Sequence, residues 1–254
     1  MSDSPSNSFA NDSQWHLVLE GGLVANATEH PDSPILLSFF EGYDRAFVLP
    51  NEREELDGFR RCLEINEAMR TRFGRIHKEL VMTLEDESTG EILGGANFLA
   101  TRIDNSPENH PSIAVALNYL FVDSTVRGRG LSRRLLEAVA TLAGRAVGDP
   151  GHTHRPAIFI EQNDPLQLSD EEYAADSAHA GIDQIDRLAI WARLGARLVD
   201  FPYIQPPLSE TQESDDNLTY AVLGFQPDQM DAGYFRNHLE SFFGISVFKG
   251  KDPA

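Results

Sequence analysis

The stretch Ala114–Ala143, AVALNYLFVDSTVRGRGLSRRLLEAVATLA, combines three patterns in one uninterrupted segment. Up to Val122 it is almost wholly apolar and rich in Val, Leu and aromatic residues, which indicates a buried strand. A polar break at Asp123–Thr125 and a glycine-rich turn follow. From Leu131 onward the apolar residues recur at helical spacing. We therefore expect a strand, a glycine-rich turn and a helix in succession.

The turn between them gathers scarce positive charge. The chain has a formal net charge of -19 and only 21 Lys and Arg residues, yet Arg127, Arg129, Arg133 and Arg134 fall within eight positions. The first turn of a helix has unpaired N–H groups and a partial positive charge, so phosphate binds there readily. The pattern indicates a polyanion site, and a solvated helix start is the alternative. The spacing disfavours both the nucleotide P-loop and the dinucleotide-binding motif.

These residues resemble a known family motif. The sequence RGRGLS at residues 127–132 is similar to the acetyl-CoA signature R/Q-x-x-G-x-G/A of the GNAT superfamily of N-acetyltransferases, although Ser132 replaces the usual Gly or Ala. The resemblance implies a mixed, mostly antiparallel α/β sheet flanked by helices, with acetyl-CoA as cosubstrate and no metal. It also implies that acetyl-CoA is bound by Phe121, Val122, Arg127, Gly128, Arg129, Gly130, Leu131, Ser132, Arg133 and Asn163.

Length and composition limit the classes of protein to which the chain can belong. Its 254 residues, 41% of them hydrophobic, include no apolar run long enough to span a membrane and no signal-peptide pattern at the start. A single cysteine, Cys62, excludes an internal disulfide and fits a reducing compartment, so we expect a cytoplasmic protein. We expect a disordered or irregular leader over residues 1–30 and one domain over residues 31–254. The negative charge argues against nucleic acid as a partner; it either steers a cationic amine or serves solubility.

Periodicity and turn residues predict the remaining elements. We expect strands at residues 35–40, 80–84, 91–100, 157–161 and 218–225, and a strand with a proline-closed loop at 197–208. We also expect an extended piece at 45–49 and helices at 56–63, 170–180, 185–194 and 227–243. Ser169 and Glu172 form a capping-box pattern before the second of these helices. The acidic segment 166–183 is longer than the family's usual connection, so we expect it to influence substrate choice. His152 and His154 lack a third ligand at recognisable spacing, which favours a surface loop over a metal site.

In the family, the strand that follows the signature helix diverges from the central strand and leaves a gap for the pantetheine arm. Here that strand is Ala157–Glu161, and the backbone of Phe121 and Val122 would bond the arm. Glu161 and Asn163 would then lie nearest the reacting end. Glu161 is either the general base or a loop carboxylate paired with an arginine. Asn163 either bonds the pantetheine or makes a turn.

A second block, residues 188–196, is similar to the family pattern Phe-Tyr-x-x-Leu-Gly-Phe but places Trp191 where the tyrosine stands. That tyrosine often protonates the leaving thiolate, which an indole cannot do. Tyr119, Tyr203 or solvent would have to replace it. Tyr203 and Gln205 are candidates for the acceptor pocket, with a rigid edge strand as the alternative.

The resemblance implies acetyl transfer from acetyl-CoA to a primary amine by direct attack, with Glu161 and Tyr203 as the candidate catalytic residues. One alternative is an N-acyl synthase that uses a longer acyl chain, which a wide apolar tunnel beyond Phe121 would favour. Another is a non-catalytic acyl-CoA-binding or sensing protein. The expected partner is a small-molecule or peptide amine, and a homodimer is common in the family.

Overall fold

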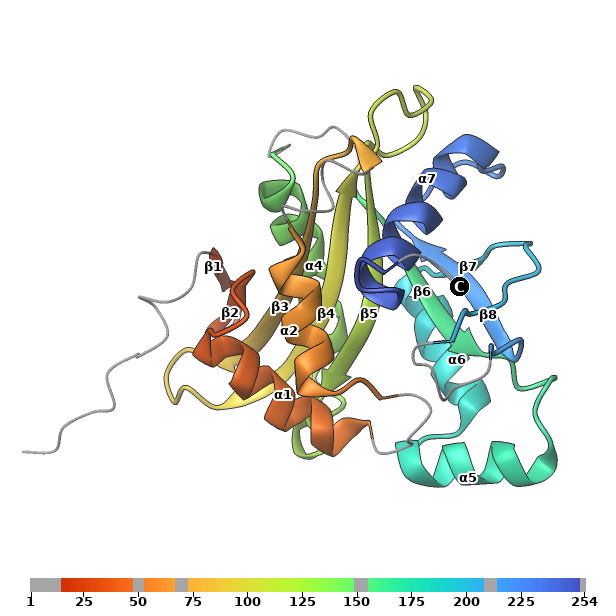
Figure 1. Ribbon diagram of the computed structural model, residues 1–254. Helices are drawn as coiled ribbons and strands as arrows, with labels where there is room; N and C mark the ends of the chain where they lie inside the picture. The colour runs from red at the N-terminus through yellow and green to blue at the C-terminus, as the bar shows by residue number, and fades with distance from the viewer. Residues whose placement is uncertain (1–14, 48–52, 67–72, 149–154, 208–213, 252–254) are drawn as a thin grey trace, which may run out of the picture.

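The computed structural model describes residues 15–47, 53–66, 73–148, 155–207 and 214–251. Their strands form one eight-stranded sheet in the order β1-β2-β3-β4-β5-β6-β8-β7 (Figure 1). Only β5 and β6 pair in parallel, and every other pair in this sheet is antiparallel. The expected mixed, mostly antiparallel sheet is confirmed. The strands are β1 (Trp15–Leu19), β2 (Leu23–Thr28), β3 (His77–Asp86), β4 (Ile92–Arg102), β5 (Ile113–Val122), β6 (Ala157–Asn163), β7 (Arg197–Leu198) and β8 (Leu218–Leu223).

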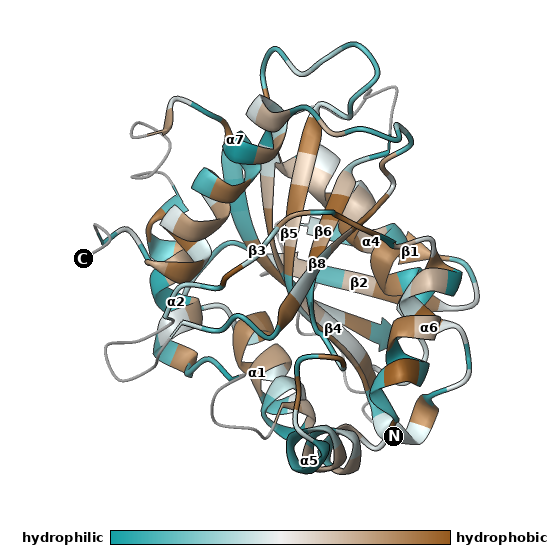
Figure 2. Ribbon diagram, turned by 90° about the vertical axis from the view of Figure 1, so that its right-hand side faces the viewer, coloured by the Kyte–Doolittle hydropathy of each residue, from teal (hydrophilic) through white to brown (hydrophobic). Residues whose placement is uncertain are grey.

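Helices cover both faces of this sheet. They are α1 (Pro34–Ala46), α2 (Leu56–Glu64), α4 (Leu131–Ala146), α5 (Asp170–Ala180), α6 (Gln184–Leu194) and α7 (Ala232–Phe242), with a 3-10 turn η1 (Ser124–Val126) and a π-helical turn η2 (Phe243–Val247). Figure 1 shows α1, α2 and α7 in front of the sheet and α4 behind it. In Figure 2 the central strands carry long brown segments, whereas the helices carry alternating teal and brown bands. Such banding is expected of helices that bury one face only. None of the helices in the described ranges is long and apolar enough to cross a membrane.

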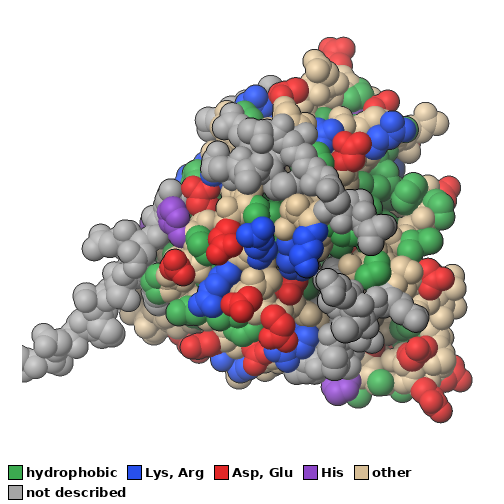
Figure 3. Space-filling view, viewed as in Figure 1, with side chains coloured by type: hydrophobic (Ala, Val, Ile, Leu, Met, Phe, Trp, Pro, Cys, Tyr) green, Lys and Arg blue, Asp and Glu red, His purple; other side chains and the backbone are tan. Residues whose placement is uncertain are grey.

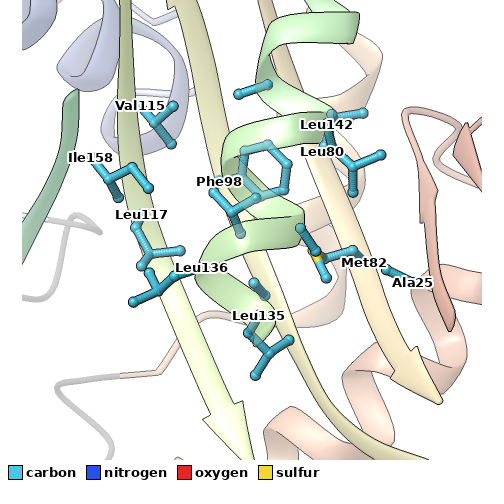
Figure 4. Close-up of a cluster of buried hydrophobic side chains, with 14 of the residues drawn as sticks. Ala25, Leu80, Met82, Phe98, Val115, Leu117, Leu135, Leu136, Leu142 and Ile158 are labelled. Atoms are coloured by element: carbon cyan, nitrogen blue, oxygen red, sulfur yellow. The ribbon is translucent and has the colours of Figure 1, made fainter. Parts of the chain in front are cut away.

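The core behind the sheet forms where α4 packs on the strands. Leu135 and Leu142 of α4 are fully buried against Met82, Phe98 and other strand residues (Figure 4). This is the helix that the sequence predicts from Leu131, and its apolar stripe is confirmed. Because Leu135 has no exposed surface, its replacement by Ala is expected to cost roughly 2–5 kcal/mol.

The run at residues 35–40 is a helix, and the expected strand is wrong. Ser33 caps α1 by accepting a hydrogen bond from Ile35 N at 3.3 Å, and Pro34 occupies the first helical position. Both residues are typical of a helix start. The buried positions follow helical spacing, whereas Leu37 is 46% exposed. The extended piece expected at 45–49 is also wrong for residues 45 and 46, which are the last two residues of α1. Residues 48–52 lie outside the described ranges.

Both ends of the domain differ from expectation. Residues 15–19 and 23–28 form β1 and β2, so the irregular leader expected over residues 1–30 is wrong for them; residues 1–14 lie outside the described ranges.

The last helix begins after Asp231, and not at Pro227 as expected. Asp231 caps it by accepting a hydrogen bond from Tyr234 N at 2.8 Å. Gly244 follows the helix inside η2. A Cβ at that position would lie 2.3 Å from the Phe73 ring, so the glycine permits close packing.

Candidate active site

The parallel strands β5 and β6 separate after a short paired segment. Their register pairs are Ala114 with Ala157, Val115 with Ile158, and Ala116 with Phe159. Beyond these pairs β6 continues alongside β8, and β5 continues alongside β4. The backbone groups of residues 117–122 that face β6 therefore have no strand partner in the described sheet. The gap expected between these two strands is confirmed.

A β-bulge lies at the point of separation. Asn97 of β4 pairs with Tyr119 and Phe98 pairs with Leu117, so Asn118 is the extra residue. The side chain of Asn118 reaches Asn97 Oδ1 at 3.0 Å, on the face of the sheet that carries α1 and α2. Bulges re-aim side chains and end strand pairing. The bulge thus turns a polar side chain toward the gap.

A cavity of about 290 Å³ occupies this gap. It is lined by Tyr119 and Leu120 of β5, by residues 160–163 of β6, and by Trp191 of α6. From the opposite face of the sheet it is lined by Glu54 and residues of α2. The cavity therefore passes between the strands and connects the two helical layers. Trp191, which stands where the family pattern has tyrosine, is half-buried in its wall.

Glu161 lies in the cavity wall near the end of β6 and is half-buried. Tyr203 donates a hydrogen bond from its hydroxyl to Glu161, and Gln205 Nε2 lies 3.0 Å from each carboxylate oxygen. Burial raises the pKa of Glu161 to about 7, although these two hydrogen bonds act in the opposite direction. A carboxylate with that pKa can take a proton at neutral pH. The alternative in which an arginine pairs with Glu161 is wrong for the described residues.

Tyr203 belongs to an aromatic cluster behind Glu161. It is 5% exposed, and its ring centroid lies 4.6 Å from that of Tyr220. Burial, followed by the charge of Glu161, raises the pKa of Tyr203, so it stays protonated and remains a donor. Among the described residues that line the cavity, Gln205 is present and Tyr203 is not. Of the strand and proline-closed loop expected over 197–208, Arg197–Leu198 form the strand β7, and the backbone of Gln205 bridges to Asp215.

Asn163 is the last residue of β6 and lines the cavity. Its side-chain Nδ2 lies 3.4 Å from Asp176 Oδ1, in α5. Asp176 is 5% exposed and forms an ion pair with Arg187 of α6. The segment 166–183 therefore packs at this end of the cavity, and its helix α5 has the predicted capping box at Ser169.

The glycine-rich turn leaves the start of α4 open. Gly128 and Gly130 have φ values of 84° and 74°, and a Cβ added at either would meet no atom within 4 Å. Gly130 is the N-cap of α4 and offers no side chain to the first N–H groups of the helix. Those donors remain available to an anion, with Leu131 buried beneath them and Ser132 half-buried beside them. The turn therefore fits a phosphate group.

The arginines of the turn do not all face the same way. Arg127, Arg129 and Arg133 are exposed, and Arg127 Nη1 donates to the carbonyl of Ala180 at 3.2 Å. Arg134 instead pairs with Glu137 at 3.0 Å and with Glu20 at 3.2 Å. Three of the four arginines are thus placed to meet a polyanion. The contact of Arg127 also brings the end of α5 beside the turn.

The central strand near its end is held by close packing. Phe121 is 6% exposed and belongs to an aromatic cluster with Phe39, and a Cβ at Gly42 would lie 2.5 Å from its ring. The space on the ring side of Phe121 is therefore filled by the protein. Val122, half-buried, pairs with Gly94 of β4. A long acyl chain would need room that this packing occupies.

Two cavity residues carry no sequence signal that we recognised. Gln184 is 1% exposed, and both polar atoms of its side chain lack a hydrogen-bond partner among the described residues. Gln162 Oε1 is likewise buried and unpaired within that part of the chain. Both line the cavity on the α6 side, where they can bond an amide-containing ligand. Gln184 opens α6, and its burial depends on packing that local sequence patterns do not encode.

Cys62 is buried within α2, as expected, and burial raises the pKa of its thiol, so it is not a nucleophile at neutral pH. His152 and His154 lie outside the described ranges.

Comparisons with known proteins identify similar folds among solved structures. No protein-family model matches the chain, and no curated protein matches its sequence. Among solved structures, one described as a candidate GNAT-family acetyltransferase from Bacteroides thetaiotaomicron is 15% identical, with 85% of this chain and 92% of that chain covered and a TM-score of 0.52. A ribosomal-protein-S5-alanine acetyltransferase from Vibrio fischeri is 12% identical, with 84% and 100% covered and a TM-score of 0.46.

A candidate GNAT-family acetyltransferase from Bordetella pertussis is 16% identical, with 83% and 99% covered and a TM-score of 0.44. The similarity to the Bacteroides protein extends over most of both chains, so this chain has the GNAT fold that the turn at residues 127–132 suggested.

Proposed function

We propose that this protein is an N-acetyltransferase that moves an acetyl group from acetyl-CoA to a primary amine by direct attack in a ternary complex. The observation that carries the proposal is Glu161, a carboxylate with a pKa of about 7 in the wall of a cavity between two separated strands. The gap offers unpaired backbone groups to one substrate, and the carboxylate offers a proton acceptor to the other.

The cosubstrate would be held along the gap. The open N–H groups at the start of α4, with Arg127, Arg129 and Arg133 around them, would receive the pyrophosphate. The pantetheine arm contains amides and would bond the unpaired edge of β5, with Gln162 and Gln184 as further partners. Asn163 would contribute from the end of β6. The filled space beside Phe121 favours the acetyl group over a longer acyl chain.

The chemistry needs one proton acceptor and one stabilised oxygen. Glu161 would take a proton from the substrate ammonium, and the freed nitrogen would attack the thioester carbonyl carbon. Backbone N–H groups of β5 would stabilise the negative charge that develops on the carbonyl oxygen. The nitrogen gives up its second proton to solvent, the C–S bond breaks, and CoA leaves as a thiolate. Holding both substrates in one cavity would supply much of the rate.

The thiolate would then take a proton from Tyr119 or from solvent. Tyr119 lines the cavity, and burial raises its pKa, so it holds its proton. Tyr203 donates to Glu161 instead, so we assign it the role of positioning that carboxylate. Because a thiolate is a good leaving group, loss of the usual tyrosine at Trp191 is compatible with turnover.

A calorimetric titration with acetyl-CoA, free CoA and ATP tests the cosubstrate. We expect both CoA species to bind and ATP not to bind, because only CoA species carry the pantetheine arm that the gap accepts. Amines are then screened for release of CoA. Failure of both CoA species to bind would leave a fold without this chemistry.

A further inference from the structure

A second carboxylate lies in the wall of the same cavity. Glu79 of β3 is 1% exposed, and neutral donors hold it: Asn97 Nδ2 at 2.7 Å, Asn118 Nδ2 at 2.9 Å and Ser246 Oγ at 3.0 Å. No Lys or Arg of the described ranges forms an ion pair with it. Burial raises the pKa of Glu79 to about 7. Burying a carboxylate without a paired cation costs free energy, which hydrogen bonds to neutral donors offset only in part.

Another glutamate on β3 is buried in the same way but lies away from the cavity. Glu85 is 2% exposed and receives hydrogen bonds from Asn26 Nδ2 at 3.0 Å and Thr83 Oγ1 at 2.6 Å. It does not line the cavity described above. Glu79 and its three donors do line it. We call these four residues, Glu79, Asn97, Asn118 and Ser246, the Glu79 group.

The Glu79 group also presents an acceptor that has no donor. Asn118 uses its Nδ2 for the hydrogen bonds within the group, while its Oδ1 is buried and unpaired among the described residues. Ser246 donates its hydroxyl proton to Glu79 and accepts from Asn118 Nδ2 at 3.2 Å, so one of its two lone pairs stays free. Buried acceptors are normally paired. The group therefore lacks a donor, and an ammonium carries three.

The other charges around the cavity already have partners or are negative. Glu54 lines the cavity and pairs with Lys249 at 2.6 Å, and Arg187 lines it and pairs with Asp176. Asp215 also lines it and adds negative charge near Glu161. Among the described residues of the wall, the charges without a partner of opposite sign are thus carboxylates. On the visible part of the face that carries α1 and α2, Figure 3 shows Lys and Arg side chains mixed with Asp and Glu.

We propose that the acceptor is a compact aliphatic diamine, one nitrogen of which reacts beside Glu161 while the second, as an ammonium, is held by the Glu79 group. This inference rests on the proposed function for the identity of the reacting end. The second ammonium bonds Asn118 Oδ1 and Ser246 Oγ, and the charge of Glu79 behind them balances it. A monoamine of the same length leaves the Glu79 group without a donor.

Calorimetric titrations with putrescine and n-butylamine, each with and without free CoA, test the diamine site without any turnover. The two amines have the same carbon chain and differ in one cationic group. We expect wild-type protein to bind putrescine at least about tenfold more tightly. Glu79→Gln should lower the affinity for putrescine to that for butylamine. Glu85→Gln, a buried glutamate of the same strand, should keep the preference.

Equal affinity for the two amines, no binding of putrescine to wild-type protein at millimolar concentration, or an unchanged preference in Glu79→Gln would each overturn the diamine site. Should Glu79→Gln fail to fold by circular dichroism, Asn118→Ala removes the unpaired oxygen and should also abolish the preference. The two proposals fail separately. Putrescine preference without binding of CoA species would refute acetyl transfer alone, and acetylation of both amines without preference would refute the diamine site alone.

Discussion

The Tyr203 hydroxyl donates a hydrogen bond to the Glu161 carboxylate across 42 residues of chain. Gln205, two residues further along, reaches both oxygens of the same carboxylate. The segment that follows β7 therefore fixes the orientation of Glu161 at the cavity wall. It also opposes the effect of burial on the pKa of Glu161, since each hydrogen bond favours the charged form.

Replacing Glu161 by Gln should remove the proton acceptor while keeping the shape of the side chain. We expect kcat/KM to fall by roughly 100-fold to 10,000-fold, as is typical of the loss of a general base. In wild-type protein kcat/KM should rise with pH through about 7, as the carboxylate loses its proton, and then level off. The variant should lack this rise. Turnover with the wild-type pH profile in Glu161→Gln would refute the assignment, and calorimetry with acetyl-CoA provides the control for folding.

Tyr203→Phe should separate positioning from proton donation. The hydroxyl lowers the pKa of Glu161, so its removal should move the rising part of the pH profile above the wild-type position. At pH values above the new midpoint, turnover should return to near the wild-type rate. A loss of turnover that is equal at every pH would instead identify Tyr203 as the acid for the thiolate. Steady-state kinetics over a range of pH distinguish these results.

Gly130→Glu should abolish binding of acetyl-CoA, because a carboxylate at the start of α4 would repel the pyrophosphate. Gly130→Ala is the matched control. It imposes the same positive φ, at a cost of roughly 1–2 kcal/mol in stability, and its Cβ would meet open space, so acetyl-CoA should still bind. Gly148→Glu, at the other end of α4, should leave binding intact. Calorimetry measures all three. Normal affinity in Gly130→Glu would place the pyrophosphate elsewhere.

Glu79 should make stability depend on pH. Its pKa of about 7 in the folded protein exceeds the ordinary value of 4.5, so folding favours its protonated form. This contribution to the free energy of unfolding is full below about pH 4.5, falls as pH rises toward 7, and amounts to roughly 3 kcal/mol. Glu79→Gln removes it. Urea unfolding at pH 5 and pH 8 should therefore show wild-type protein losing more stability than the variant over that interval. A constant difference between the two proteins would contradict this account.

The sequence predicts local patterns well. In the stretch Ala114–Ala143 the strand, the turn and the helix each depend on neighbouring residues, so all three are confirmed. The run ILLSFF at residues 35–40 is ambiguous, since a short apolar run suits a buried strand or a buried helix. The preceding Ser33 and Pro34, which are typical of a helix start, distinguish the two cases in favour of a helix.

The site depends on contacts between distant residues, which local patterns do not encode. Glu79 directly precedes the mostly apolar run Leu80–Leu84, but its partner Ser246 lies 167 residues away. The importance of Gln205 becomes visible only when its segment packs against β6. The separation of β5 and β6 was expected from the family resemblance alone, because no pattern within either strand marks where pairing stops.

The separation of β5 and β6 after Ala116 and Phe159 divides the sheet into two groups of strands. One group comprises β1 to β5 and the other comprises β6, β8 and β7, and three register pairs at one end join them. Amide hydrogen exchange should accordingly give different opening free energies for the two groups of strands. A ligand bound in the gap would form hydrogen bonds with both groups of strands and replace the strand pairing that is absent there. Binding of the ligand should then slow amide hydrogen exchange in strands that it does not contact, in β1 as well as in β8.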